Sequence, residues 1–260
     1  MDIEHISVSR YQTWQQCQMQ YKFRYHLRVV PPGEEPFYFT YGKVIHKIAQ
    51  NYVEAKGGRL LKDVTQDVLS GNVVIEEGRD GRPNIYCPSE IPSEYKKRMP
   101  SHLRAIERLT EQIGFGGVTE HKFRYDLDPP HHRFVTGFID RFIEKDGNFF
   151  IIDYKTSKES RFRKNQLTIL SDLQLRTYAR VVQREFNVKA DNIKCALYYL
   201  EGAKLIGAKY SQQSLEAAEA ELLEAYKQIE GTEPDAAWGN VGQHCERCDY
   251  VKMCPFYRMH

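Results

Sequence analysis

The sequence lacks long hydrophobic runs, and their absence argues against several classes of protein. No apolar stretch approaches the roughly 18 residues that a membrane-spanning helix needs. The opening residues, MDIEHISVSRYQTW, contain no apolar core of the kind found in a secretory signal peptide. We therefore expect a cytoplasmic protein with no membrane partner. The hydrophobic content of 41% and the charged content of 28% are ordinary for a globular protein.

Excess charge and cysteine are also scarce. The formal net charge is only +2, so any surface that binds nucleic acid has to be a local basic patch. The 260 residues include six cysteines, which in a cytosolic protein favour metal ligation or burial over disulfides. For two of them, Cys87 and Cys195, the sequence indicates no partner or role. A chain of this length suits one large domain or two small ones.

The stretch at residues 137–155, GFIDRFIEKDGNFFIIDYK, predicts two strands joined by a tight turn. Asp146-Gly147 is a strong signal for a two-residue hairpin loop. With this loop, Lys145 faces Asn148, and the register of the whole hairpin follows. The second strand is almost wholly apolar at residues 149–152, so we expect it to be central and buried.

Two carboxylates and a lysine share one face of this predicted hairpin. Counting outward from the turn places Asp140 opposite Asp153, and Lys155 projects from the same face as Asp153. Like charges facing each other repel, so a cation between them would stabilise the pair. The pattern is typical of metal-dependent nucleases, because magnesium binds carboxylates, acidifies water and neutralises phosphate, while a lysine stabilises developing charge. The alternative is an ordinary surface hairpin, which the apolar second strand disfavours.

Helices and strands are expected along the rest of the chain. The hydrophobic pattern and the turn signals predict helices at residues 11–27, 41–55, 92–113 and 211–229 and after a capping box at Ser171-x-x-Gln174, and strands at 118–127, 193–200 and 204–210. Pro100 is expected to kink or break its helix. The run Lys96-Lys97-Arg98 is expected to form a solvated face. Residues 59–91 have weak periodicity and several turn signals, so we expect a variable, partly exposed insertion there.

Several polar residues outside the hairpin are candidates for the same site. His46 ends the helical motif GKVIH, although a lone histidine on a helix is often structural. Glu120 joins the site if its strand lies beside the hairpin. Gln174 and Tyr178 are four residues apart, so they project together from one helix face. Their alternative roles are a capping glutamine and a core tyrosine.

A short basic loop follows the hairpin. Arg161, Arg163 and Lys164 surround Phe162, and cations around an aromatic ring suit a contact that tracks a nucleic-acid backbone and stacks on bases. An ordinary surface loop is the equal alternative.

Three cysteines near the end of the chain indicate a metal site. Cys245, Cys248 and Cys254 have the spacing C-x2-C-x5-C. Four thiolates usually complete such a site. Cys17 is the best-placed fourth ligand, because it shares a predicted helix face with aromatic residues, and His244 is the alternative. The spacing leaves zinc and an iron–sulfur cluster both open.

Taken together, five pieces of the chain resemble a known family. These are GKVIH at 42–46, GFID at 137–140, DYK at 153–155, QLRTY at 174–178, and Cys17 far upstream of C-x2-C-x5-C. In this order they resemble the RecB-like nucleases of the PD-(D/E)xK superfamily. They are especially similar to the CRISPR-associated RecB-like exonucleases and to the AddB-type nuclease domains that carry a 4Fe-4S cluster.

The resemblance implies a role for each matching residue. The Mg²⁺ or Mn²⁺ ligands would be His46, Asp140, Asp153 and the carbonyl of Tyr154. Lys155 would act on the attacking water, and Gln174 and Tyr178 would contact the DNA backbone or support the site. The cluster ligands would be Cys17, Cys245, Cys248 and Cys254. Two departures are Asp153, where glutamate is common, and Ile139, where proline would precede the first aspartate.

The resemblance also implies a fold. We expect an α/β, restriction-endonuclease-like architecture, with a mixed central sheet flanked by helices and a helical part tethered by the iron–sulfur cluster. Residues 1–260 would form a single nuclease domain, with a variable helical insertion at 59–114, a catalytic core at 117–210, and a clip formed by Cys17 and residues 245–254. The protein would be cytoplasmic and encoded by a prokaryote or a phage.

The implied function is metal-dependent hydrolysis of DNA, as an exonuclease on single-stranded ends. Some members of the family serve recombination or repair and others CRISPR adaptation, so a partner protein from either process is expected, and the sequence does not choose between them. One alternative is a catalytically weak DNA-binding or scaffold subunit. Another is a zinc-stabilised nuclease that processes RNA.

Overall fold

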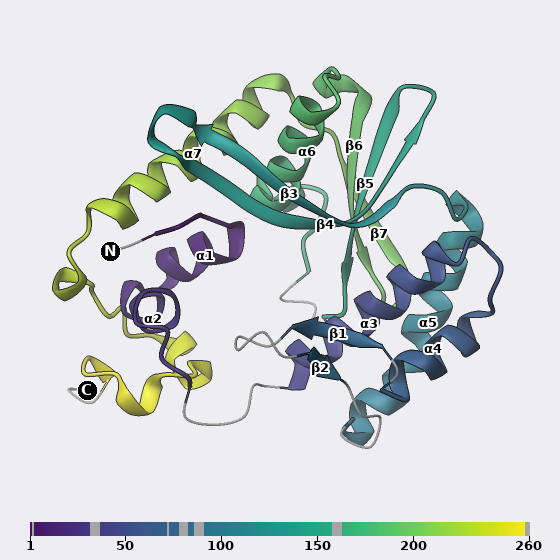
Figure 1. The fold of residues 1–260 in the computed structure, drawn as a ribbon, viewed down its shortest axis with the longest axis horizontal. Helices are drawn as coiled ribbons and strands as arrows, with labels where there is room; N and C mark the ends of the chain where they lie inside the picture. The colour runs from purple at the N-terminus through teal and green to yellow at the C-terminus, as the bar shows by residue number, and fades with distance from the viewer. Residues whose placement is uncertain are drawn as a thin grey trace. The chain divides into compact units, whose positions relative to one another are not determined.

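The computed structural model describes residues 1, 3–31, 37–71, 73–77, 83–85, 91–157 and 163–257 (Figure 1). The chain forms two compact units, and both are built from segments distant in sequence. Unit 1 comprises Met1–Glu35, Lys122–Gly137 and Gln212–His260, and unit 2 comprises Pro36–His121 and Phe138–Ser211. Of the helices in the described ranges, none is both long enough and apolar enough to cross a membrane.

In the part of the chain that the structure describes, unit 2 contains most of the sheet and four α-helices. Its helices are α3 (Phe37–Glu54), α4 (Leu61–Leu69), α5 (Ser93–Ile113) and α6 (Leu173–Glu185), and its strands are β1 (Val74–Glu77), β2 (Pro83–Ile85), β5 (Asn148–Lys155), β6 (Ile193–Tyr199) and β7 (Lys204–Ala208). Unit 1 contains α1 (Val8–Gln16), α2 (Gln18–Tyr21), a π-helical turn (Lys22–His26), α7 (Gln212–Gly231) and short 3-10 turns near the C-terminus. Two strands, β3 (Val118–Asp128) and β4 (Arg133–Lys145), contribute residues to both units.

Among the described residues, the main sheet has five strands in the order β3-β4-β5-β6-β7. The pairs β4/β5 and β6/β7 are antiparallel, whereas β5/β6 is parallel. A parallel pair needs a crossover connection, and α6 supplies it between β5 and β6. The expected mixed sheet flanked by helices is therefore confirmed. The strands β1 and β2 form a separate two-stranded sheet.

The core of unit 2 lies between helices and one face of β5 and β6. Apolar residues recur at three- and four-residue steps along α3, α4 and α5, and pack with Ile152, Tyr154 and Tyr198 of the sheet. Side chains alternate along a strand, so Cys195, three residues before Tyr198 on β6, points to the other face. There its Sγ lies 3.8 Å from the carbonyl oxygen of Leu175 in α6. In Figure 1, α6 and the group of α3, α4 and α5 lie on opposite sides of these strands.

Two expectations about helices need correction. The predicted helix at 11–27 is interrupted at Cys17, whose backbone is extended with φ −164° and ψ 113°. The chain turns there because Met19 N–H donates a hydrogen bond to the carbonyl of Trp238 at 3.0 Å. The helix N-cap near residue 171 is Asp172, which accepts from the Leu175 N–H at 2.9 Å, so the predicted capping box was wrong.

Helix α5 is continuous through Pro100, so of the two expected effects, a kink or a break, the proline does not cause a break. An internal proline costs about 3 kcal/mol, and burial of the helix face that contains Met99 and Ile106 outweighs that cost. Helix α4 was not predicted, although three of its residues, Leu61, Val64 and Val68, lie in the core of unit 2.

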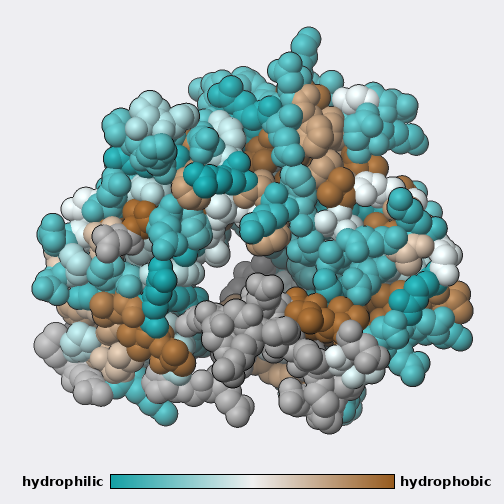
Figure 2. Space-filling model, viewed as in Figure 1, coloured by the Kyte–Doolittle hydropathy of each residue, from teal (hydrophilic) through white to brown (hydrophobic). Residues whose placement is uncertain are grey.

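On the face shown in Figure 2, hydrophilic residues cover most of the surface and hydrophobic residues gather in several separate patches.

Candidate active site

The β4–β5 hairpin has the predicted turn and register. Asp146 and Gly147 both have positive φ angles, 53° and 71°, as a two-residue hairpin loop requires. Lys145 pairs with Asn148, and the ladder continues inward to the pair formed by Arg141 and Ile152. Asp140 and Asp153 come next in that register, where β5 lies between β4 and β6. The hairpin thus carries both aspartates to one end of the central strand.

Three potential metal ligands meet at this end of the sheet. One ligand atom each from His46, Glu120 and Asp140 lies within 4.8 Å of the others. The Nδ1 of His46 is 3.5 Å from an oxygen of Asp140 and 3.9 Å from an oxygen of Glu120. Its Nε2 lies 3.1 Å from the carbonyl oxygen of Tyr154, which reaches the site from β5. Helix α3 and strands β3, β4 and β5 all contribute to this group.

Glu120 enters the group through an unusual backbone conformation. Its φ angle is 46°, in the left-handed region that residues other than glycine rarely adopt. This conformation costs about 1 kcal/mol or more, and such strain tends to occur at functional sites. Glu120 was expected to join the site only if its strand lay beside the hairpin. That condition is met, because β3 neighbours β4 in the sheet.

A chain of polar contacts runs from the second aspartate to helix α6. The Nζ of Lys155 lies 2.7 Å from Oδ2 of Asp153 and donates a hydrogen bond to Oε1 of Gln174 at 3.0 Å. The amide nitrogen of Gln174 in turn donates to the hydroxyl of Tyr178 at 2.7 Å. Asp153 lies outside the three-residue group, and its Oδ2 contacts the lysine. The side chain of Asp140 accepts the Tyr154 N–H at 2.7 Å.

Burial and crowding of charge shift the pKa values in this site. Burial lowers the pKa of His46, but the carboxylates of Asp140, Glu120 and Asp153 outweigh burial and raise it to about 9. Burial, reinforced by the neighbouring Asp140, raises the pKa of Glu120 to about 7 and that of Asp153 to about 6. Burial lowers the pKa of Lys155, but Asp153 outweighs it and the net shift is upward. His46 and Lys155 are therefore the cations that balance the buried carboxyl group of Asp153 and the partly buried ones of Asp140 and Glu120.

These donors fit a hard divalent cation. Magnesium and manganese take oxygen and imidazole ligands, and the group offers two carboxylates and one histidine. Several partly buried carboxyl groups at one point repel each other, and a bound divalent cation would relieve that repulsion. The group stands beside a lysine that is already held in place by two partners.

Comparison with known proteins agrees with this geometry. The family model described as the PD-(D/E)XK nuclease superfamily matches residues 5–255. The chain belongs to the PD-(D/E)XK nuclease superfamily. The sequence motif that names the superfamily, PD-(D/E)XK, is matched in this chain by Asp140, Asp153 and Lys155.

A solved structure shares the fold at low sequence identity. A protein from Eubacterium rectale, provisionally named an exonuclease, is 12% identical with a TM-score of 0.55, covering 99% of this chain and 88% of that chain. A second structure, of SSO0001, is 14% identical with a TM-score of 0.39, covering 92% of this chain and 95% of that chain. No curated protein matches the sequence.

The basic loop of this PD-(D/E)XK nuclease is described only in part. Arg161 lies outside the described residues. Arg163 donates to the carbonyl of Glu201 at 3.0 Å and stacks on Tyr199, and the Nζ of Lys164 lies 3.3 Å from Asp172. Both described cations therefore contact other residues of the protein. Their expected contact with DNA stays a prediction.

One residue near the site was overlooked in the sequence. Arg98, expected to be solvated, is half-buried and donates to the carbonyl of Thr156 at 2.8 Å and to Glu201 at 3.1 Å. Thr156 directly follows Lys155, so Arg98 fixes the end of the strand that carries the lysine. A run of three basic residues gives no signal that distinguishes the one that points inward.

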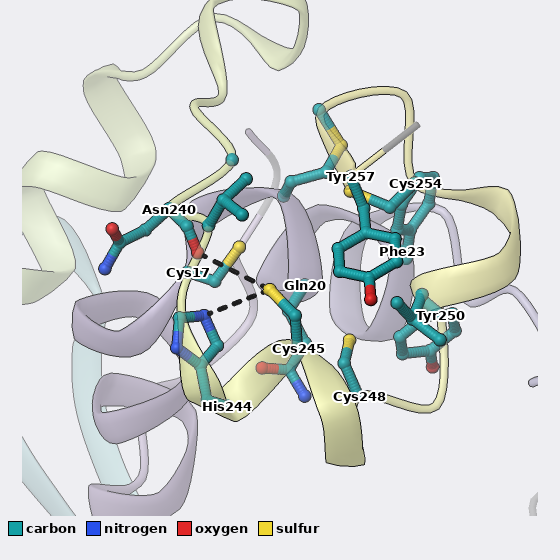
Figure 3. Close-up of a pocket in the computed structure, with 14 residues that line it drawn as sticks. Cys17, Gln20, Phe23, Asn240, His244, Cys245, Cys248, Tyr250, Cys254 and Tyr257 are labelled. Atoms are coloured by element: carbon teal, nitrogen blue, oxygen red, sulfur yellow. Dashed lines mark hydrogen bonds between the residues drawn. The ribbon is translucent and has the colours of Figure 1, made fainter. Parts of the chain in front are cut away.

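In unit 1, the four predicted cluster cysteines line one pocket (Figure 3). Cys17 and Cys245 are buried, Cys248 and Cys254 are half-buried, and all four are free thiols. His244 also lines the pocket, with its Nε2 3.8 Å from Sγ of Cys245. Cys17 comes from the break between α1 and α2, so the interruption of the predicted helix delivers this thiol to the pocket.

The surroundings of the cysteine pocket also join the two ends of the chain. Apart from the thiols and His244, the lining is largely apolar and aromatic, including Phe23 and Tyr250, whose rings are 5.5 Å apart. Arg24 pairs with Asp249 at 2.8 Å. The N–H of Gly242 points at Sγ of Cys245 from 3.5 Å, which is the kind of backbone contact that stabilises a thiolate ligand. The other cysteines differ: Cys195 is buried in unit 2, and Cys87 lies outside the described residues.

Proposed function

We propose that the protein hydrolyses DNA phosphodiester bonds with a divalent cation held by His46, Glu120 and Asp140. The observation that carries this proposal is the lysine beside the group: Lys155 contacts Asp153 at 2.7 Å and Gln174 at 3.0 Å. Asp153 and the carbonyl of Tyr154 are further oxygen donors for the cation, as the family resemblance implies. A surface hairpin would have no reason to bury this set of charges together.

The residues of the chain divide the chemistry between them. A bound Mg²⁺ or Mn²⁺ would neutralise charge on the scissile phosphate and acidify a water molecule. Lys155 remains protonated, because Asp153 holds its pKa above the ordinary value, and it stabilises negative charge that develops at the phosphate. Gln174 fixes the direction of the lysine, and Tyr178 fixes Gln174.

The proposed substrate is single-stranded DNA with a free end. The family membership and the fold shared with the Eubacterium rectale protein support nuclease chemistry, and that protein's provisional name points to action on ends. The experiment compares linear and circular single-stranded DNA with manganese. Digestion of the linear strand alone supports an exonuclease, whereas equal digestion of both contradicts end dependence. Digestion of neither contradicts the proposal itself.

We further propose that Cys17, Cys245, Cys248 and Cys254 bind a 4Fe-4S cluster that stabilises unit 1. Four thiols in one pocket suit a cluster or a zinc ion, but a zinc ion with four thiolates needs sulfur atoms about 4 Å apart. Within the described ranges, no three of these ligand atoms lie within 4.8 Å of one another, which favours the wider cluster. Analysis of iron, acid-labile sulfide and zinc tests this, and stoichiometric zinc without iron would contradict it.

A further inference from the structure

In the described part of unit 2, the core formed with helices α3, α4 and α5 covers only one half of a sheet face. Helices α3, α4 and α5 cover the end of β5 and β6 that contains Ile152, Tyr154 and Tyr198. Helix α5 ends at Ile113, and the other end of the same face lines a groove. Because the register pairs Phe150 with Lys194, their side chains share this face. Figure 1 shows α3, α4 and α5 gathered beside one end of these strands.

The open half of the face forms an apolar groove, which we call the sheet groove. Its volume is about 620 Å³, and all of its lining belongs to unit 2: Leu109, Gln112, Ile113, Ile143, Lys145, Phe150, Ile151, Ile152, Gln166, Leu170, Lys194, Cys195, Ala196, Leu205, Gly207, Ala208 and Lys209. Large aliphatic side chains are exposed in it, with Leu170 50% and Leu205 51% accessible. A contiguous apolar patch of this kind marks an interaction site more often than an ordinary surface.

The charges around the sheet groove have one sign. Three lysines line it, Lys145, Lys194 and Lys209, and no aspartate or glutamate is among the described residues of the lining. All three lysines are exposed. The whole chain is almost neutral, with 37 basic and 35 acidic residues, so three cations without a carboxylate is a local departure. An occupant of the groove should therefore be apolar on one side and acidic on its flanks.

We propose that the sheet groove binds an acidic amphipathic helix of a partner protein. Such a helix would extend the helical layer that α5 leaves incomplete, placing its apolar stripe on Leu170 and Leu205 and its carboxylates near the lysines. The chemistry of the groove requires leucine-like residues at helical spacing with glutamate or aspartate beside them.

Two other occupants fit less well. Helix α7 of a second copy is rich in glutamate, but its apolar residues, including Leu215 and Leu222, are buried in its own unit. Single-stranded nucleic acid needs aromatic rings on which bases stack. Among the described residues of the lining, Phe150 is the one aromatic side chain, and Lys194 lies over its ring at 5.0 Å.

The test uses synthetic helical peptides of about 15 residues, with leucine at helical spacing and glutamate on the flanks. Fluorescence anisotropy measures their binding to the full chain. We expect the acidic peptide to bind about tenfold or more tightly than a peptide with lysine in place of glutamate. Leu205→Glu and Lys194→Glu should each weaken acidic-peptide binding about tenfold.

Matched variants separate the groove from the rest of the surface. Leu167→Glu alters a leucine that is 79% exposed and outside the lining, and Lys204→Glu alters a β7 lysine on the opposite face. Both should bind the acidic peptide like wild type, with unchanged melting temperatures for all four variants. Equal binding of acidic and basic peptides, or no binding, would overturn the proposal. So would a single-stranded oligonucleotide or a second copy of the chain whose binding is lost in the groove variants alone.

Discussion

The Nζ of Lys155 donates to Oε1 of Gln174 at 3.0 Å while lying 2.7 Å from Oδ2 of Asp153. The lysine is therefore held between a strand neighbour and a residue on α6. Because Gln174 also donates to Tyr178, its side-chain amide is fixed with the oxygen facing the lysine. This relationship makes Gln174 a positioning residue for the proposed chemistry.

Removing the amide should slow cleavage without weakening metal binding. Gln174→Ala leaves Lys155 with one partner, and misplacement of a catalytic group costs about 10- to 100-fold in rate. We expect that loss in the cleavage rate, with little change in manganese affinity and in the melting temperature. Gln66→Ala, at an exposed position of α4, is the matched control and should cleave like wild type. Loss of manganese binding by Gln174→Ala would instead place this residue in the metal site.

Glu120 should matter for metal affinity. Glu120→Gln removes one carboxylate from the three-residue group, so we expect manganese affinity to fall about tenfold or more. Isothermal titration calorimetry measures this directly. Asp126→Asn changes an exposed carboxylate on the same strand and should leave the affinity unchanged. Wild-type affinity in Glu120→Gln would exclude Glu120 as a ligand.

Metal binding should strengthen as pH rises from about 6 to about 9. The carboxyls of Asp153 and Glu120 have pKa values raised to about 6 and about 7, and His46 has a pKa of about 9. Metal ligands must be deprotonated, so protons compete with the cation below these values and are released when it binds. Manganese titrations across this range check the trend. An affinity that is constant from pH 6 to 9 would contradict the raised pKa values.

The sequence predicted the β4–β5 hairpin more accurately than it predicted the break at Cys17 or the role of Arg98. The Asp146-Gly147 turn and the apolar run of β5 are local signals, so they determined the register from nearby residues alone. The break at Cys17 depends on a hydrogen bond to Trp238, and the role of Arg98 depends on the carbonyl of Thr156. Contacts between residues so far apart in the chain cannot be predicted from the local pattern of polar and apolar residues.

The candidate site shows the same limit. His46 and Gln174 were found through their motifs, whereas placing Glu120 required the order of β3 and β4 in the sheet. Its positive φ angle could not be foreseen either, because glutamate rarely adopts it. The sheet groove depends on where α5 ends relative to the strands, and this is a tertiary relationship without a sequence signature.

Loss of one of the proposed cluster ligands should lower the melting temperature more than the rate of DNA cleavage. Cys248→Ser should lose iron and lower the melting temperature by about 5 °C or more, because a clip between the chain ends restricts the unfolded chain. Cys195→Ser, in unit 2, is the control and should retain its iron. A variant that loses iron but keeps the wild-type melting temperature would show that the cluster does not stabilise the fold.

Manganese-dependent cleavage of end-labelled linear single-stranded DNA by Asp153→Ala is the most direct measurement. Asp153 is 2% exposed and contacts Lys155, so its removal should reduce cleavage about 1,000-fold or more, with DNA binding largely retained. Asp63→Ala, an exposed position on α4, should cleave like wild type. Full cleavage by folded Asp153→Ala would contradict the assignment of the active site.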